Sequence, residues 1–251
     1  MSTTRAVDPD ELVDLISAHR TSALLAFDVD GVLAPLVDHA DESRLLPGVH
    51  DSLASLADDA TVAIVSGRAL ESLERLFAFP AGLHVVGSHG LEVRGIDPAP
   101  LDERERRTLD QLEIIATRAV DAAGDGAWIE HKPASVVVHT RTADPERSRA
   151  AVDAVVDLGS LVDGAQVKPG SDVVELLARS ASKGDALLGL ADRLGRTPIV
   201  YLGDDVTDED AFAVMGAHDI SVRVGPGDTR ARYRLSGPTE VAELVRALGA
   251  A

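Results

Sequence analysis

The amino-acid sequence predicts an α/β fold in which a doubly wound parallel sheet carries an inserted second domain. Three observations lead to this prediction. Apolar runs rich in β-branched residues alternate with helical patterns at the start of the chain, the alternation stops near residue 95, and it resumes near residue 182. Strands that alternate with helices form parallel sheets with helices on their faces. We therefore expect a core domain in two pieces, residues 1–95 and 180–251, and an inserted domain over residues 96–179.

Hydrophobic periodicity predicts the elements of the first core piece. Apolar side chains three or four residues apart indicate helices, as at Val49, Leu53 and Leu56, whereas uninterrupted apolar runs indicate buried strands. The predicted order is a strand over 23–29, a helix from about 48, a strand over 61–65, a helix through 70–77 and a strand over 83–86. This βαβαβ order is typical of a parallel sheet.

The inserted segment has a different pattern. A long, heavily charged stretch over 98–123 precedes WIEHK, a turn at Pro133 and ASVVVHTR, and two runs joined by a short turn predict a β-hairpin. A helix over 145–158 and short runs at 166–168 and 172–177 follow, so we expect an α+β domain with its own antiparallel sheet. The core alternation then resumes with a helix through 187–194, a strand over 198–202, a helix from about 208, a strand over 220–224 and a final helix to 251.

The composition limits the class of protein. The 251 residues are 45% hydrophobic and carry a net charge of −18, which opposes binding to nucleic acid or to an anionic membrane. The chain has no cysteine, which excludes disulfides, thiolate metal sites and a cysteine nucleophile. The polar, acidic N-terminus lacks the pattern of a signal peptide, and no run is long enough to span a membrane. We expect a cytoplasmic monomer that binds neither nucleic acid nor membranes.

The first candidate site is Asp28-Val29-Asp30-Gly31, at the end of an apolar run. Ligands of parallel α/β sheets bind at the carboxyl ends of the strands, so both carboxylates are expected to face a site. The alternative is a hairpin, because Asp-Gly between apolar runs is a strong turn signal. Pro35, which would lie in the second strand of such a hairpin, and the βαβ alternation that follows favour the site.

A second acidic cluster, GDDVTDED, follows another apolar run. A helix start explains Asp208, Glu209 and Asp210, because acidic side chains cap free N–H groups and interact favourably with the helix dipole. It does not explain Asp204 and Asp205. Acidic side chains at two strand ends indicate a hard divalent cation, and Mg2+ suits carboxylates that share it with a phosphate.

Two weaker signals are Ser66-Gly67-Arg68 after a predicted strand and Ser182-Lys183-Gly184 at a predicted helix start. A hydroxyl, a helix-start amide and a lysine suit a phosphoryl group, and Lys183 is one of three lysines in the chain. Each signal alone is better explained as an ordinary loop or a solvated surface residue. Their order along the chain gives them weight: a DxDG motif, a serine after a strand, a lysine and an acidic loop.

This ordered set resembles the four motifs of the haloacid dehalogenase superfamily of phosphatases. The resemblance implies a haloacid dehalogenase core with an inserted α/β cap domain, Asp28 as nucleophile and Asp30 as general acid and base. It also implies Ser66 and Lys183 as phosphate ligands, and a magnesium site at Asp28, Asp30 and Asp204. In such chemistry the nucleophile attacks phosphorus, the second aspartate protonates the leaving oxygen and then activates water, and Mg2+ with the lysine offsets the growing charge.

Within that superfamily the sequence is most similar to the trehalose-6-phosphate phosphatases, from Phe27 to Phe212. The likeness is carried by DVDGVLAP, SGR, GSHGLE, IEHKPASVVVHTR, GSDVVEL, SKG and GDDVTDEDAF. It implies a mobile cap that closes over the active site, with an E-x-K motif and a downstream Glu that hold sugar hydroxyls. The further substrate-binding residues so implied are Gly67, Arg68, His89, Glu130, Lys132, Arg141 and Glu175. Val32 departs from the family, in which Thr often follows the glycine of the first motif.

The cap residues also have a simpler interpretation. Glu130 and Lys132 lie two apart on a strand, hence on one face, and such a pair is alternatively a cross-strand charge pattern exposed to solvent. His89, in a glycine-rich turn, is alternatively a loop residue. Sugar hydroxyls nevertheless suit charged groups that would otherwise stay unpaired in a closed site, and the resemblance favours this function.

The expected function is Mg2+-dependent hydrolysis of trehalose 6-phosphate through an aspartyl phosphate. One alternative is another sugar phosphatase of the same superfamily, acting on sucrose phosphate or a glucosylglycerate-type phosphate. A second is a signalling module that accepts phosphate on an aspartate, because clustered aspartates with one lysine also suit that role. Asp30 and the long insertion argue against the module, which needs neither.

Overall fold

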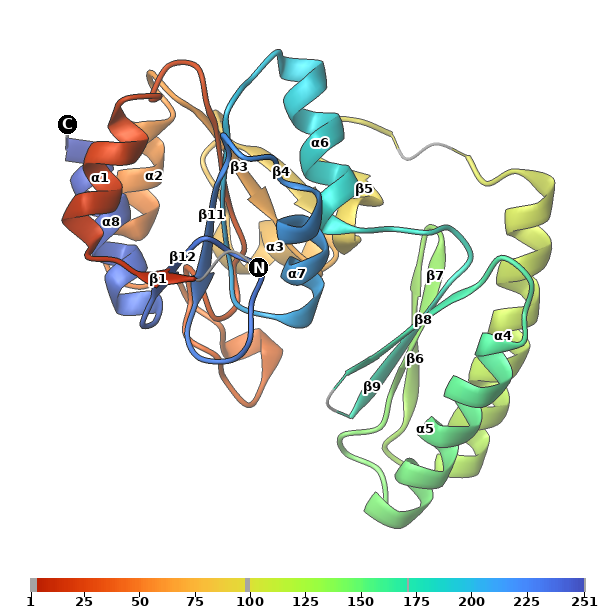
Figure 1. The fold of residues 1–251 in the computed structure, drawn as a ribbon. Helices are drawn as coiled ribbons and strands as arrows, with labels where there is room; N and C mark the ends of the chain where they lie inside the picture. The colour runs from red at the N-terminus through yellow and green to blue at the C-terminus, as the bar shows by residue number, and fades with distance from the viewer. Residues whose placement is uncertain (1–3, 98–99, 171, 251) are drawn as a thin grey trace. The chain divides into compact units, whose positions relative to one another are not determined.

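The computed structural model describes residues 4–97, 100–170 and 172–250. The chain forms two compact units, one built from Met1–Asp97 and Ser182–Ala251 and the other from Pro98–Ala181, which we name the core unit and the inserted unit. Figure 1 shows that the inserted unit interrupts the chain between the strand β5 and the helix α6 of the core unit. Within the described residues, no helix combines the length and the apolar composition needed to cross a membrane.

The described part of the core unit contains an eight-stranded sheet in the order β1-β12-β11-β10-β2-β3-β4-β5. Neighbouring strands are parallel except β4 and β5, which are antiparallel. The strands are β1 (Arg5–Ala6), β2 (Leu24–Phe27), β3 (Thr61–Val65), β4 (His84–Gly87), β5 (Glu92–Val93), β10 (Ile199–Gly203), β11 (Ile220–Val224) and β12 (Tyr233–Leu235). All four residues of β2 are buried, as expected for a strand in the middle of a sheet that is covered on both faces.

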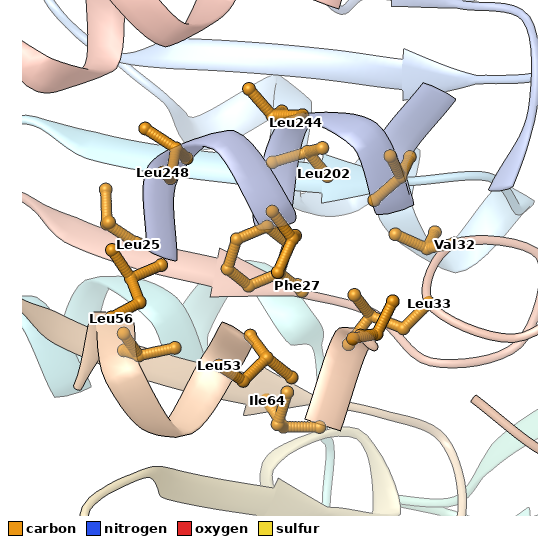
Figure 2. Packing of buried hydrophobic residues seen from close by; sticks show 14 of the residues in the cluster. Leu25, Phe27, Val32, Leu33, Leu53, Leu56, Ile64, Leu202, Leu244 and Leu248 are labelled. Atoms are coloured by element: carbon orange, nitrogen blue, oxygen red, sulfur yellow. The ribbon is translucent and has the colours of Figure 1, made fainter. Parts of the chain in front are cut away.

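Helices cover both faces of this sheet (Figure 1). They are α1 (Pro9–Ser17), α2 (Val49–Leu56), α3 (Leu70–Phe77), α6 (Lys183–Leu194), α7 (Val206–Val214) and α8 (Pro238–Ala250). Because successive strand residues point to opposite faces, Leu25 and Phe27 pack with α1, α2, α3 and α8, whereas Leu24 and Ala26 pack with α6 and α7. Figure 2 shows the first of these clusters, with Phe27 among leucines of α2 and α8.

The described part of the inserted unit is a four-stranded antiparallel sheet with two helices packed on one face (Figure 1). The strand order is β6-β7-β9-β8, and the elements are α4 (Glu103–Ala123), β6 (Trp128–Lys132), β7 (Ser135–His139), α5 (Pro145–Ser160), β8 (Gln166–Gly170) and β9 (Val173–Leu177). Val136, Val138, Val174 and Leu176 point toward the helices and form the hydrophobic core of this unit with them. The alternate residues of the strands therefore lie on the face that the helices leave open.

The predicted α/β class, with a mostly parallel sheet, is confirmed, as is the β-hairpin of the insertion. The charged stretch at 98–123 was not recognised as a helix, yet most of it forms α4, which begins with a capping box between Asp102 and Glu105. The sequence analysis also missed α1 and the strands β1, β5 and β12. These strands have only two or three residues, too few for a periodic pattern.

Candidate active site

The candidate active site lies at the carboxyl ends of three neighbouring strands of the core sheet. Asp28 follows β2, Ser66 follows β3 and Asp204 follows β10, and β2 lies between the other two strands. The three strands are parallel, so their carboxyl ends meet at one edge of the sheet. This arrangement brings together residues that are up to 176 positions apart in the sequence.

Asp28 is buried and paired with Lys183. The Lys183 ammonium, at the first residue of α6, lies 2.8 Å from Asp28 Oδ2 and 2.8 Å from Asp208 Oδ1, and it is also buried. Burial raises the pKa of Asp28 to about 7, although the charge of Lys183 acts in the opposite direction. Burial alone would lower the pKa of Lys183, but the two carboxylates beside it raise that pKa, so the lysine stays charged.

Asp208 holds the acidic loop together. Its Oδ1 accepts hydrogen bonds from Lys183 and from the Tyr201 hydroxyl, 2.5 Å away, and its Oδ2 accepts from the backbone N–H groups of Asp204 and Asp205, each at 2.9 Å. Burial opposes ionisation, but the charge of Lys183 and these hydrogen bonds together lower the pKa of Asp208. Asp208 is therefore a fully buried, ionised carboxylate whose two oxygens are both engaged.

The side chains of Asp28, Asp204 and Asp208 can hold a metal ion. One carboxylate oxygen from each lies within 4.8 Å of the others. Burial raises the pKa of Asp204 to about 7, and the negative charges of Asp28 and Asp208 add to this effect. A hard cation with oxygen ligands would relieve this concentration of negative charge. Because both oxygens of Asp208 already accept hydrogen bonds, Asp28 and Asp204 offer the better ligand atoms.

Gly31 allows Asp204 to approach the first motif. A Cβ atom at Gly31 would lie only 1.9 Å from Asp204 Oδ2, and the backbone has a φ of +75°, which favours glycine. Any larger residue there would displace the Asp204 carboxylate. The glycine of the DxDG motif therefore makes room for the Asp204 carboxylate and is not part of a hairpin turn.

Asp30 is held by Arg68 and Ser43. The Arg68 guanidinium binds the carboxylate with two nitrogens, at 2.5 Å and 2.7 Å, and the buried Ser43 hydroxyl donates to Oδ1 at 2.9 Å. Arg68 also donates to the Ala40 carbonyl at 3.0 Å. Such a two-pronged ion pair fixes orientation as well as charge. The Asp30 carboxylate lies outside the group of three that can hold a metal.

The loop after β3 is bonded to the turn after β4, and these two segments carry Ser66, Gly67 and His89. The His89 backbone N–H donates to the Ser66 carbonyl at 3.0 Å, and a Cβ at Gly67 would lie 2.6 Å from the imidazole ring. Glu92 accepts hydrogen bonds from the Ser88 hydroxyl and, at 3.2 Å, from the Leu70 backbone N–H at the start of α3. These contacts fix the backbone that carries the predicted phosphate ligands.

The other predicted residues lie in the inserted unit. Lys132 Nζ is 3.2 Å from Glu175 Oε1, which also accepts from the Ser135 hydroxyl at 2.7 Å. By strand register, these three side chains and Glu130 share the face of the sheet that the helices leave open. Arg141 follows the opposite end of β7 from Ser135, and its Nε lies 3.8 Å from Asp172.

Sequence reasoning missed four residues that shape the core site. Asp208 was assigned only to a helix start, and it does form a capping box with Asp205. That local pattern does not predict its hydrogen bond with Lys183. Tyr201 is hidden in an apolar strand. Ser43 and Glu92 lie in connecting segments whose partners are distant in the sequence, so no local pattern marks them.

Comparison with known proteins identifies the family. A family model described as trehalose-phosphatase matches residues 26–238. The trehalose-phosphate phosphatase of Mycobacterium marinum is 35% identical over 231 residues, which cover 86% of this chain and 59% of that protein, so the chain spans little more than half of that relative's length. The trehalose-6-phosphate phosphatase of Escherichia coli K12 is 33% identical over 223 residues, covering 86% of this chain and 82% of the relative.

A solved structure shows the same fold. The C-terminal domain of the Candida albicans trehalose-6-phosphate phosphatase superposes with a TM-score of 0.79 at 22% identity, covering 99% of both chains. The resemblance to trehalose-6-phosphate phosphatases, drawn from the sequence motifs, is thereby confirmed. The chain belongs to the trehalose-phosphatase family.

Proposed function

We propose that this chain is a Mg2+-dependent phosphomonoesterase that hydrolyses trehalose 6-phosphate to trehalose and phosphate through a phosphorylated Asp28. The single observation that carries the proposal is the buried Asp28 carboxylate at the end of β2, 2.8 Å from the ammonium of Lys183 and grouped with Asp204 and Asp208. Membership of the trehalose-phosphatase family supports the substrate. Monomeric state and cytoplasmic location stay predictions from the sequence.

In the first step, an Asp28 oxygen attacks phosphorus and the bond to the sugar oxygen breaks. Asp30 gives a proton to that leaving oxygen, and Lys183 offsets the charge on the phosphoryl oxygens. In the second step, Asp30 takes a proton from water, and the water attacks phosphorus to release phosphate and restore Asp28. Arg68 and Ser43 support this role because they fix the orientation of the Asp30 carboxylate.

We propose that Mg2+ is held by Asp28 and Asp204, with Asp208 keeping the acidic loop in place. The fit rests on the oxygen-only donor set and on the closeness of three carboxylates; burial, with the nearby negative charges adding to it, raises the pKa of Asp28 and of Asp204 to about 7. When bound, the ion supplies positive charge for the phosphoryl oxygens. The sequence analysis also assigned Asp30 to the metal; its carboxylate is paired with Arg68 and lies outside the group of three that can hold the ion.

The remaining site residues divide between phosphate and sugar in this proposal. The phosphate is assigned to the loop after β3 and the turn bonded to it, next to the carboxyl end of β2 that carries Asp28. These segments contain Ser66, Gly67, Arg68 and His89. The inserted unit is proposed as the cap, and its sugar contacts are Glu130, Lys132, Arg141 and Glu175. The ion pair between Lys132 and Glu175 supports this assignment, because it offers donors and acceptors in one place to hydroxyl groups.

Phosphate release tests the proposal. Trehalose 6-phosphate, sucrose 6-phosphate, glucose 6-phosphate and an aryl phosphate are each supplied with Mg2+ to the wild type and to Asp28→Asn. We expect selective turnover of trehalose 6-phosphate that Asp28→Asn abolishes. Preference for another ester would keep the mechanism and overturn the substrate. Absence of release from any ester would favour a phosphate-accepting signalling module.

A further inference from the structure

An aromatic pair lies at one end of the inserted sheet. Trp128, the first residue of β6, stacks on His139, the last residue of β7, with ring centroids 3.9 Å apart and planes 4° from parallel. Trp128 is the only tryptophan of the chain, and it is 51% exposed. A large aromatic side chain that leaves half of its surface in water forgoes much of the free energy that burial would provide.

The pair lies on the open face of the sheet. Trp128 pairs with His139 in the strand register, and Trp128 has the same parity along β6 as Glu130 and Lys132. The helices α4 and α5 cover the opposite face, so the indole is not part of the hydrophobic core of the unit. A cross-strand aromatic pair stabilises the edge of a sheet, and that alone explains the stacking. It does not explain why the exposed edge strand carries an indole beside a row of charged groups.

His139 connects the indole to this charged row. Its Nε2 lies 2.9 Å from Glu130 Oε2, and this hydrogen bond, more than any other effect, holds the pKa of Glu130 below its ordinary value. Glu130 is thereby fixed as a charged acceptor next to the indole. Farther along the same face, Lys132, Ser135 and Glu175 add a donor, a hydroxyl and a second acceptor. The face therefore offers a flat apolar surface at one end and hydrogen-bonding groups beside it.

We propose that Trp128 contacts the sugar, its exposed indole surface stacking against one pyranose ring of a disaccharide phosphate while Glu130 binds a hydroxyl of the same ring. A pyranose presents apolar C–H groups on its faces and hydroxyl groups around its edge, which matches this combination of surfaces. His139 is a positioning residue that covers the other indole face and orients Glu130. This inference rests on the proposed function, which supplies the disaccharide phosphate.

Tryptophan emission tests the contact directly, because Trp128 is the only tryptophan. Asp28→Asn with Mg2+ is titrated with trehalose 6-phosphate, and calorimetry under the same conditions records binding. We expect a saturable change in emission at the concentrations where heat is released, and none with inorganic phosphate or sorbitol at equal concentration. Binding detected by calorimetry with unchanged emission would overturn the inference.

Kinetics supply the second test. Trp128→Ala is expected to raise KM for trehalose 6-phosphate about five- to twentyfold with little change in kcat, since lost ground-state contacts weaken binding of substrate and transition state alike. Trp128→Phe should recover most of the affinity. Ile114→Ala is the matched control, because Ile114 is an apolar residue of α4 that is about as exposed as Trp128. An unchanged KM in a folded Trp128→Ala protein would refute the sugar contact.

The two proposals fail separately. If the wild type does not hydrolyse trehalose 6-phosphate, the proposed function is wrong whatever Trp128 does. If the wild type hydrolyses it and the Trp128 variants behave as the control does, only the sugar contact is wrong.

Discussion

Replacement of Lys183 by methionine tests the electrostatic reasoning about the core site. The substitution keeps the length of the side chain but removes the cation that lies 2.8 Å from both Asp28 and Asp208. Lys183 is 2% exposed, so water cannot take over its role. Breaking a buried ion pair on one side costs about 3–5 kcal/mol of folding stability, because a charge is left buried without a partner.

The cost is expected to depend on pH. Asp28 has a pKa of about 7 beside Lys183, and loss of that cation raises the pKa further. A carboxyl whose folded pKa is raised binds a proton that the unfolded chain has lost, so stability falls as pH rises toward the folded pKa. At pH 6 a proton on Asp28 can replace the missing cation in Lys183→Met, whereas at pH 8 a smaller fraction of Asp28 is protonated. The loss of stability should therefore grow by up to about 1.4 kcal/mol per pH unit for this carboxyl.

Urea unfolding in EDTA at pH 6 and pH 8 provides the measurement. Circular dichroism follows the whole chain, while emission of Trp128 follows the inserted unit and should be little affected. Arg75→Met is the control, because Arg75 and Asp41 form a 2.9 Å pair that is largely exposed, which contributes less than about 1 kcal/mol. Addition of Asp28→Asn to Lys183→Met should reduce the pH dependence. An equal loss at both pH values, or a loss no larger than that of Arg75→Met, would refute the reasoning.

Two further predictions follow from the acidic cluster. Because Asp28 and Asp204 each have a pKa raised to about 7, the Tm of the metal-free protein should fall between pH 5 and pH 7 in thermal scans. Mg2+ should raise the Tm at pH 8, and Asp204→Asn should weaken both effects. A Tm that rises between pH 5 and pH 7 contradicts the assignment. Gly31→Ala should lower kcat/KM about a hundredfold by displacing the Asp204 carboxylate. Gly195→Ala, which has a similar positive φ and nothing within 4 Å, should keep its activity, and equal losses in the two variants would refute the steric argument.

The order of strands and helices in the core could be predicted because buried parallel strands are continuous apolar runs. The run that forms β2 and the run that forms β10 were both recognised, but nothing in either run states that they lie side by side. That adjacency, across about 175 residues, brings Asp204 to Asp28. The positions of the two acidic motifs at two strand ends already indicated a shared cation, and the family resemblance named Asp28, Asp30 and Asp204 as its ligands.

Short or weakly apolar elements escaped prediction for a physical reason. The buried stripe of α4 consists of Leu112 and small residues such as Ala116, Ala119 and Ala123, which give little hydrophobic contrast among many charges. Likewise the polar partners of Asp30 and Asp208 lie in segments far away in the sequence. Local patterns encode helices, strands and caps, whereas the pairing of buried polar groups depends on the tertiary fold.

The charges in the core site indicate that substrate and cation bind together. Asp28, Asp204 and Asp208 face a single buried cation, Lys183, so the fully ionised cluster carries two negative charges in excess. Arg68, a further cation beside the predicted phosphate ligands, is already paired with Asp30. A phosphate ester adds more negative charge to this place, in a chain whose net charge is −18. Burial, with the negative charge of Asp208 adding to it, raises the pKa of both Asp28 and Asp204 to about 7, so ionisation of the whole cluster is already costly before the substrate binds. A divalent cation and the anionic substrate should therefore bind cooperatively, each offsetting the electrostatic cost that the other would meet alone.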